Sequence, residues 1–148
     1  MIYRLTLHRK PCRVKEAQEL YGVVIKEPLD VARLVRRLLE QEAQEVFLTI
    51  HLNVRNTVIG FIEIARGGYD LCSVDIRTIF GSALLAGSAA IIVAHNHPSS
   101  GLPDPSPEDF ELTQKIVECG KMLTLPVLDH IIFGTDGSYV SLAERGLM

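Results

Sequence analysis

Two histidines that share one strand end, and an acidic residue that opens the next helix, are the residues best placed to do chemistry. The apolar run 91–94 predicts a buried strand, and His95 and His97 follow at its carboxyl end. In extended chain, residues i and i+2 point to the same side, so both imidazoles can reach one cation. Pro107 begins a predicted helix whose first turn contains Asp109. Two imidazoles, one carboxylate and an open fourth position are typical of a catalytic zinc site.

Each of these residues also has a purely structural explanation. A His-x-His pair is common in proteins that bind no metal at that pair, and Ser106 to Asp109 fits a capping box in which the acid serves the helix terminus. The combination favours the metal site. Four of the seven prolines lie between Pro98 and Pro107, and their fixed φ angles restrict the loop that joins the strand to the helix.

Length and composition bound the class of protein. A chain of 148 residues predicts one domain with a core that needs no disulfides. The net charge of -3 argues against binding nucleic acid through phosphate contacts, although it does not exclude a nucleic-acid partner. Cys12, Cys72 and Cys119 are an odd number without Cys-x-x-Cys spacing, which is typical of reduced thiols in the cytoplasm. We expect a cytoplasmic chain with no signal peptide and no membrane partner.

Hydrophobic periodicity predicts three helices on a mostly antiparallel or mixed sheet, an α/β sandwich. The expected helices begin at Pro28, Ile76 and Pro107, the last ending at Gly120, and the expected strands cover residues 45–53, 57–64, 71–74, 91–94, 127–133 and 138–142. Alternating residues 2–7 predict an edge strand or arm that could pair across a homo-oligomer. We interpret residues 1–27 as an arm packed on a domain of residues 28–148.

The ordered set His95-x-His97-Pro98 and Ser106-x-x-Asp109 resembles the JAMM motif of the MPN-domain metalloproteases. The string Ala-His-Asn-His-Pro-Ser, together with Asp129-His130 and the stretch 139–146, resembles the RadC family in particular, over about residues 30–148. The loop between His97 and Ser106 is one residue longer than the family pattern. The resemblance implies an α/β (α+β) MPN/JAMM fold, similar to cytidine deaminases, with a mixed sheet flanked by about three helices.

The same resemblance implies a zinc-dependent metallohydrolase, a peptidase or isopeptidase that cleaves amide bonds in a peptide or protein substrate. Zinc would lower the pKa of bound water and polarise the scissile carbonyl, and a carboxylate would pass the water proton to the leaving amine. In JAMM enzymes that carboxylate lies at the start of the strand after the first long helix, which is Glu45 here, with Glu63 as a second candidate. Either could instead be an exposed acid at a strand end. Ser106 would donate a hydrogen bond to the oxyanion, unless capping the helix occupies its hydroxyl.

Two further sets of residues and two further functions stay open. For Asp129 and His130 we expect a role behind the ligands or in core hydrogen bonding rather than direct metal ligation. His51, among apolar strand residues, is expected to be a core or interstrand histidine whose ring nitrogens are hydrogen-bonded. The alternative functions are a protein associated with DNA repair or recombination, as RadC proteins have been labelled, and a non-catalytic MPN interaction module.

Overall fold

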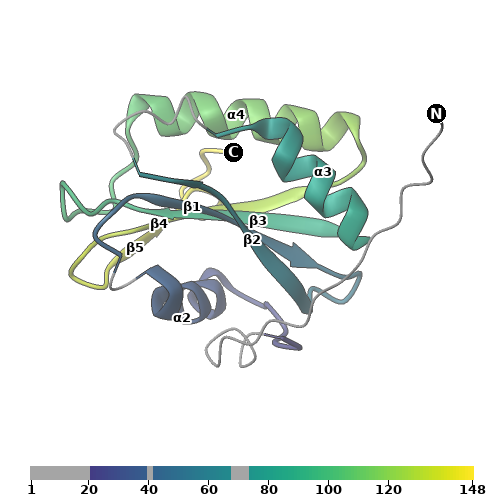
Figure 1. The fold of residues 1–148 in the computed structure, drawn as a ribbon, viewed down its shortest axis with the longest axis horizontal. Coiled ribbons are helices and arrows are strands. Elements are labelled where there is room, and N and C mark those ends of the chain that lie inside the picture. The colour runs from purple at the N-terminus through teal and green to yellow at the C-terminus, as the bar shows by residue number, and fades with distance from the viewer. Residues whose placement is uncertain (1–20, 40–41, 68–73) are drawn as a thin grey trace, which may run out of the picture.

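A five-stranded sheet lies between helices α3 and α4 on one face and helix α2 on the other (Figure 1). The computed structural model describes residues 21–39, 42–67 and 74–148. Its elements are α2 (Pro28–Leu39), β1 (Val46–Leu52), β2 (Val58–Arg66), α3 (Ile76–Ala86), β3 (Ala90–Asn96), α4 (Pro107–Met122), β4 (Val127–Phe133) and β5 (Tyr139–Ser141). The predicted α/β architecture is confirmed. The expected arm over residues 2–7 and most of the expected strand over 71–74 lie outside the described residues.

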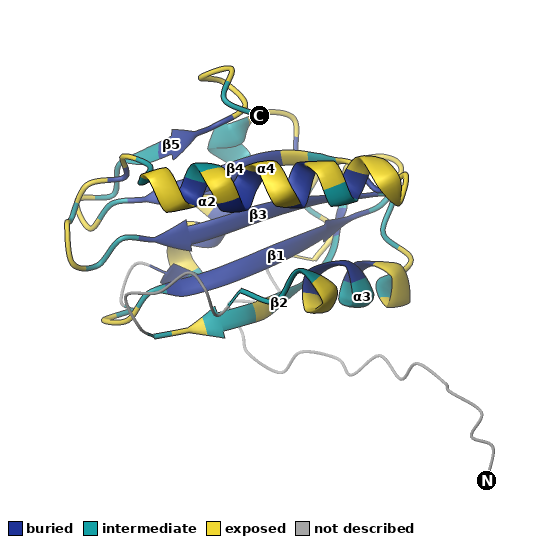
Figure 2. Cartoon of the chain, turned by 90° about the horizontal axis from the view of Figure 1, so that it is seen from above, coloured by how far each residue is buried: buried dark blue, intermediate teal, exposed yellow. Residues whose placement is uncertain are grey.

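The sheet is mixed, and its strand order is β2-β1-β3-β4-β5. Strands β3 and β4 are parallel, while the other three pairs are antiparallel. A parallel pair requires a crossover connection, and α4 supplies it across one face of the sheet. Every residue of β1 and β3 is buried, as the dark blue strands in Figure 2 show. The strand that delivers the two histidines is therefore the centre of the sheet.

Alternation along β3 sorts its side chains between two cores. Ile92 and Ala94 pack in the cluster that includes α2, whereas Ile91 and Val93 pack in the cluster that includes α3 and α4. His95 continues the second series because side chains alternate across a strand. The α3 and α4 layer thus covers the face of the sheet on which His95 lies.

The helices differ from their predicted form in two places. Helix α4 continues to Met122, so the prediction that it ends at Gly120 was wrong. A Cβ at Gly120 would lie 2.7 Å from the Leu125 carbonyl oxygen, so glycine is needed inside the helix for a close contact with the following turn. In α3, helical spacing predicts Leu84 on the buried face, but its side chain is exposed. None of the helices in the described ranges has the length and apolar character required to cross a membrane.

The side chain of Asn96 ties the end of β3 to the chain that enters β1. Its Oδ1 accepts a hydrogen bond from the Val46 N–H at 2.7 Å, and its Nδ2 donates to the carbonyls of Gln44 at 3.0 Å and Glu42 at 3.4 Å. The carbonyl of Glu45 accepts a further bond from the Gly67 N–H at 2.8 Å. The backbone is therefore held on both sides of Glu45.

His51 is a buried histidine of β1, paired by its Nδ1 with the Ser88 hydroxyl at 2.9 Å. Its Nε2 is buried and has no hydrogen-bond partner, so the expectation that both ring nitrogens are hydrogen-bonded was wrong. Burial disfavours the charged imidazolium and lowers the pKa of His51 to about 4. Between this pKa and the ordinary pKa of histidine, the unfolded chain therefore binds a proton at His51 and the folded protein does not.

We expect this histidine to make stability depend on pH. Between the unfolded pKa near 6.5 and the folded pKa near 4, only the unfolded state binds the proton, so stability is lost as pH falls through this window. Lowering the pH from about 7.5 to about 5 should cost the metal-free wild type about 2 kcal/mol more than His51→Leu. Urea unfolding of both proteins at the two pH values measures the difference, and equal losses would contradict the assignment.

Removing the Asn96 side chain should destabilise the fold. Asn96→Ala leaves the buried Val46 N–H without its acceptor, which should lower the free energy of unfolding by about 1–3 kcal/mol. Asn96→Asp keeps that acceptor but places a carboxylate oxygen against the carbonyls of Gln44 and Glu42, so it should also be less stable than the wild type. Chemical denaturation of the three proteins measures the effect. An alanine variant as stable as the wild type would show that these bonds do not hold the segment.

Candidate metal centre

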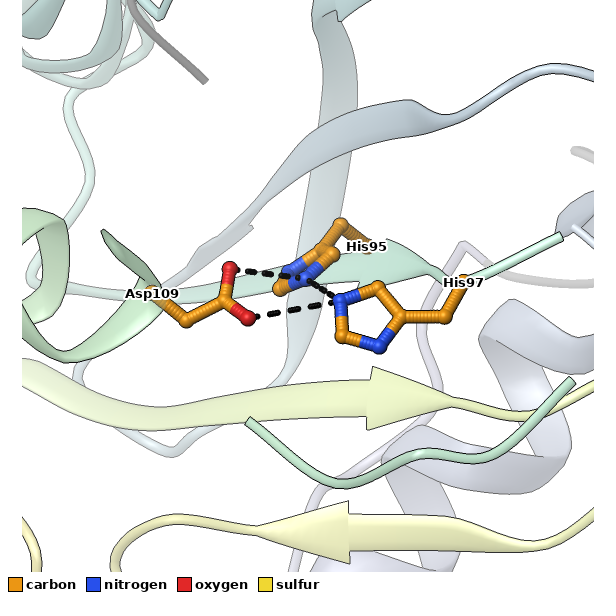
Figure 3. Close-up of side chains that lie close together, drawn as sticks. All are labelled: His95, His97 and Asp109. Carbon is orange, nitrogen blue, oxygen red and sulfur yellow. Dashed lines mark hydrogen bonds and ion pairs between the residues drawn. The ribbon is translucent and has the colours of Figure 1, made fainter. Parts of the chain in front are cut away.

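His95, His97 and Asp109 converge at the carboxyl end of β3 (Figure 3). The two Nε2 atoms are 2.9 Å apart, and Asp109 places Oδ1 3.1 Å from His95 Nε2 and Oδ2 3.3 Å from His97 Nε2. The side chains of His95 and Asp109 are fully buried, whereas that of His97 is 15% exposed. The cluster is thus closed from behind and reached by solvent at His97. Within the described ranges it is the one group of metal-ligating side chains with this spacing.

Asp109 reaches the histidines from the capping box at the start of α4. The Ser106 hydroxyl accepts a hydrogen bond from the Asp109 N–H at 3.1 Å, and Asp109 Oδ2 accepts from the Ser106 N–H at 2.7 Å and its hydroxyl at 2.9 Å. Capping and metal binding are compatible because they use different oxygens. Oδ1 is buried beside His95 and has no hydrogen-bond partner. A buried carboxylate oxygen without a partner is an atom that a bound cation would satisfy.

His97 is oriented by the loop that follows β3. Its Nδ1 lies 3.2 Å from the Leu102 carbonyl, which can only accept, so Nδ1 carries the proton and Nε2 offers its lone pair. The loop is fixed by backbone bonds from the His97 N–H to the Phe133 carbonyl and from the Thr135 N–H to the Gly101 carbonyl. Gly101 adopts φ +73°, where a side chain is strained. The β4–β5 turn therefore holds the partner of His97 in place.

The charges of the cluster support one another. Burial alone would raise the pKa of Asp109, but His95 and His97, which can donate to it and carry positive charge when they are protonated, and the N–H of Ser106 hold it well below its ordinary value. The hydrogen bond to Asp109 raises the pKa of His97, against the opposing effect of burial. A carboxylate that stays ionised inside the protein favours a positive charge between the rings.

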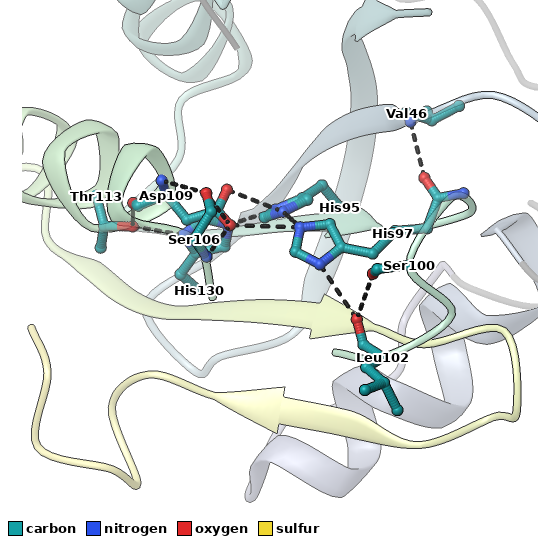
Figure 4. Close-up of polar contacts among 10 residues, drawn as sticks. Val46, His95, His97, Ser100, Leu102, Ser106, Asp109, Thr113 and His130 are labelled. Atoms are coloured by element: carbon teal, nitrogen blue, oxygen red, sulfur yellow. Dashed lines mark hydrogen bonds and ion pairs between the residues drawn. The ribbon is translucent and has the colours of Figure 1, made fainter. Parts of the chain in front are cut away.

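Behind His95 lies a second layer of polar contacts (Figure 4). His95 Nδ1 is 2.8 Å from His130 Nε2, and His130 Nδ1 is 2.6 Å from the Thr113 hydroxyl. The Phe47 ring stacks on His95 with centroids 5.8 Å apart and meets His130 edge-on at 5.6 Å. Burial lowers the pKa of His130 well below its ordinary value, so this ring is neutral. Our sequence reasoning missed Thr113, although it lies one helical turn after Asp109 and so on the same face.

Asp129 faces away from the cluster. It shares the α2 side of β4 with Ile131, and its carboxylate accepts hydrogen bonds from the Ser141 hydroxyl at 2.6 Å and the Ala143 N–H at 3.1 Å. Burial raises the pKa of Asp129 despite these hydrogen bonds. The two members of the Asp129-His130 pair thus belong to opposite faces of the sheet, and only His130 contacts His95.

Glu45 directly precedes β1 and is half-buried beside the cluster. Burial raises the pKa of its carboxyl group, positive charge on His95 and His97 when they are protonated lowers it, and the negative charge of Asp109 raises it. Glu45 is therefore within electrostatic reach of all three residues. Among the described residues, it does not belong to the group whose donor atoms lie within 4.8 Å of one another, so it is placed beside the ligand set and not in it.

Glu63, the second carboxylate considered as a base, is engaged elsewhere. It lies on β2, where its two oxygens accept hydrogen bonds from Arg66 Nε at 2.8 Å and Nη2 at 2.7 Å. These bonds lower the pKa of Glu63. An exposed, paired carboxylate of low pKa is a weak proton acceptor, which distinguishes Glu63 from Glu45.

The donor set fits a divalent metal ion. Two imidazole nitrogens and one carboxylate oxygen are ligands that zinc and several other first-row metals accept, and three protein ligands leave a position open. The unpartnered Oδ1 of Asp109 and the free lone pair of His97 Nε2 are directed into the same small volume. These three residues could therefore hold one metal ion.

Comparison with known proteins shows the family of the chain. Residues 25–147 match the family model described as RadC, a RadC-like JAB domain. The chain is 42% identical over 133 residues to a UPF0758 protein of Clostridium perfringens, an alignment that covers 90% of this chain and 58% of the relative. It is 41% identical over 124 residues to a UPF0758 protein of Methanosarcina mazei, covering 84% and 53%. A UPF0758 protein of Salinibacter ruber is 43% identical over 122 residues, covering 82% and 51%.

The chain spans little more than half the length of these curated relatives. The family model nevertheless covers most of this chain, including both histidines and Asp109. The five-stranded mixed sheet and three helices of this chain are consistent with a JAB fold, which is related to MPN domains. The chain belongs to the RadC family.

Proposed function

We propose that this chain is a zinc-dependent hydrolase of amide bonds that acts as a peptidase or isopeptidase on a peptide or protein substrate. The observation that carries the proposal is the convergence of His95, His97 and Asp109 on one small volume, with one carboxylate oxygen left without a partner. Membership of a JAB-domain family supports it, while the names of the relatives state no reaction.

His95, His97 and Asp109 would hold the ion. Zinc is favoured over calcium and magnesium because two of the three donors are imidazole nitrogens. When bound, such an ion supplies Lewis acidity, which makes water a better nucleophile near neutral pH and polarises an amide carbonyl. The exposed edge of His97 marks the side from which a substrate would approach, since the other two ligands are fully buried.

Glu45 is the proposed general base. Its carboxylate would take a proton from the attacking water and deliver it to the leaving amine. A base must be ionised to act, and a pKa above the ordinary glutamate value brings its basicity closer to neutral pH. Asn96 contributes by holding the backbone on both sides of Glu45.

Ser106 is the proposed donor to the oxyanion. Its hydroxyl has a single proton, which bonds Asp109 Oδ2, so it cannot serve Asp109 and a substrate together. The Ser106 N–H also bonds that oxygen at 2.7 Å. Asp109 therefore keeps a partner when the hydroxyl turns toward a developing negative charge, which is the chemistry that an oxyanion donor requires.

Zinc binding is the first test. Purified wild-type protein should bind one equivalent of zinc, and zinc at about 100 times its dissociation constant should stabilise the fold by about 2.7 kcal/mol. His97→Ala removes a ligand at the partly exposed side and should abolish both effects. Glu63→Gln, which changes an exposed ion pair, should retain both. Elemental analysis and thermal unfolding measure them, and a His97→Ala protein that still binds zinc would contradict the ligand assignment.

The second test separates the two candidate bases. Zinc-loaded protein is incubated with a mixture of peptides and lysine-linked isopeptides, and mass spectrometry reads the new termini. Glu45→Gln should keep its zinc but lose roughly 10²–10⁴-fold in rate, whereas Glu63→Gln should cleave as the wild type does. The wild-type rate should fall as the pH is lowered through the raised pKa of Glu45, because the base becomes protonated.

A Glu45→Gln variant that is as active as the wild type would exclude Glu45 as the base. Zinc binding by the wild type without cleavage of any member of the mixture would favour the non-catalytic interaction module.

A further inference from the structure

We propose that Thr113 is a positioning residue that, through His130, sets the tautomer of His95. The hydrogen bonds run in a fixed order from His95 Nδ1 to His130, then to the Thr113 hydroxyl and finally to the main-chain carbonyl of Asp109. The inference rests on the proposed function in one respect, which is that His95 is taken to be a metal ligand. The order of the bonds itself stands on the distances alone.

The direction of each bond follows from counting protons. The Thr113 Oγ1 lies 2.6 Å from the Asp109 carbonyl oxygen, which can only accept, so the single hydroxyl proton points there. Thr113 must then accept the bond at 2.6 Å from His130, so His130 carries its proton on Nδ1. The ring of His130 is fully buried and its hydrogen-bond partners in the described part of the chain are His95 and Thr113, neither of them a carboxylate that would stabilise a second proton. With its single proton on Nδ1, His130 accepts through Nε2 at 2.8 Å from His95 Nδ1–H.

The consequence appears at the other nitrogen of His95. A neutral imidazole protonated on Nδ1 has a bare lone pair on Nε2, the atom directed at His97 and Asp109. His97 reaches the same tautomer by an independent route, through the Leu102 carbonyl. Both rings then direct the lone pairs of their Nε2 atoms to one point. A cation bound there would stabilise this arrangement, whereas a proton on either Nε2 would remove a ligand.

Thr113 also links two of the proposed ligands. It belongs to α4, one turn after Asp109, and bonds the main chain of that residue while its oxygen receives the bond from His130. Thr113 and His130 are both fully buried, so water does not replace either partner. A single hydroxyl therefore fixes the ring of His95 relative to the start of α4.

The experiment reads tautomers directly. In the ¹⁵N-labelled 148-residue chain, long-range ¹H–¹⁵N spectra distinguish a protonated ring nitrogen from a bare one, before and after zinc is added. We expect Nδ1–H for His130 and His95 in the metal-free wild type, and for both after zinc loading. Finding His130 protonated on Nε2 in the metal-free wild type would overturn the proposal without any variant.

Substitution of Thr113 tests the effect on metal affinity. Thr113→Val keeps the shape but removes the hydroxyl, so His130 loses the acceptor for its Nδ1–H and should shift its proton to Nε2. Zinc affinity, measured by competition with a chromophoric chelator, should fall roughly 10–100-fold. Thr113→Ser restores the hydroxyl and should recover both the tautomer and the affinity.

Thr49→Val is the matched control. Thr49 is also a fully buried threonine, on β1, but its hydroxyl has no hydrogen-bond partner. The same change of atoms there should leave the tautomers and zinc affinity unchanged. A Thr113→Val protein that folds and binds zinc within about twofold of the wild type would refute the proposal.

Failure of the proposed function gives a different result. Wild-type protein that shows His130 Nδ1–H but binds no zinc would remove the metal site and support the hydrogen-bond order. Zinc binding with the opposite His130 tautomer would remove the positioning role alone.

Discussion

The buried carboxylate of Asp109 is the constraint around which the centre is built. An ionised carboxylate without solvent is very unfavourable unless hydrogen bonds and positive charge compensate it. The first turn of α4 supplies part of that compensation through the Ser106 N–H and hydroxyl and the positive end of the helix dipole. The rest must come from positive charge on the side of Asp109 that faces His95 and His97, either on these imidazoles or on a cation that they bind. The loop from β3 to α4 therefore has to bring a strand end and a helix start to within a few ångströms of each other.

Local features of the sequence were sufficient to predict much of this. Side-chain alternation placed both histidines on one side of a buried strand, and the Ser-Pro-x-Asp pattern placed a helix terminus with an acid in its first turn. The mixed sheet and its three helices also followed from periodicity and are confirmed. Side-chain alternation and helix capping follow from residues that are close in the sequence, so they can be predicted without knowing the tertiary packing.

What could not be predicted depends on contacts between distant segments. Asn96 stands between the two histidines, yet its partners lie around residue 44, across the pairing of β3 with β1. Thr113 carried a local signal, one turn after Asp109, but the ring that it bonds comes from β4. Gly120 resembled a helix end, whereas the close approach of the Leu125 carbonyl requires glycine inside the helix. Each of these roles is set by the packing of elements that sequence alone does not place.

The alternation of β3 has one more consequence. His95 faces α4 while its neighbour Asn96 faces the segment that carries Glu45, so one strand end serves both sides of the sheet. A slip of β3 by a single residue would turn the imidazole into the α2 core and the amide toward α4, dismantling both halves in one step. A misregistered chain would thus retain neither the cluster of His95, His97 and Asp109 nor the hydrogen bonds that hold the segment around Glu45. Correct pairing of β3 and assembly of the three-residue cluster are therefore acquired together, through the alternation of side chains along one strand.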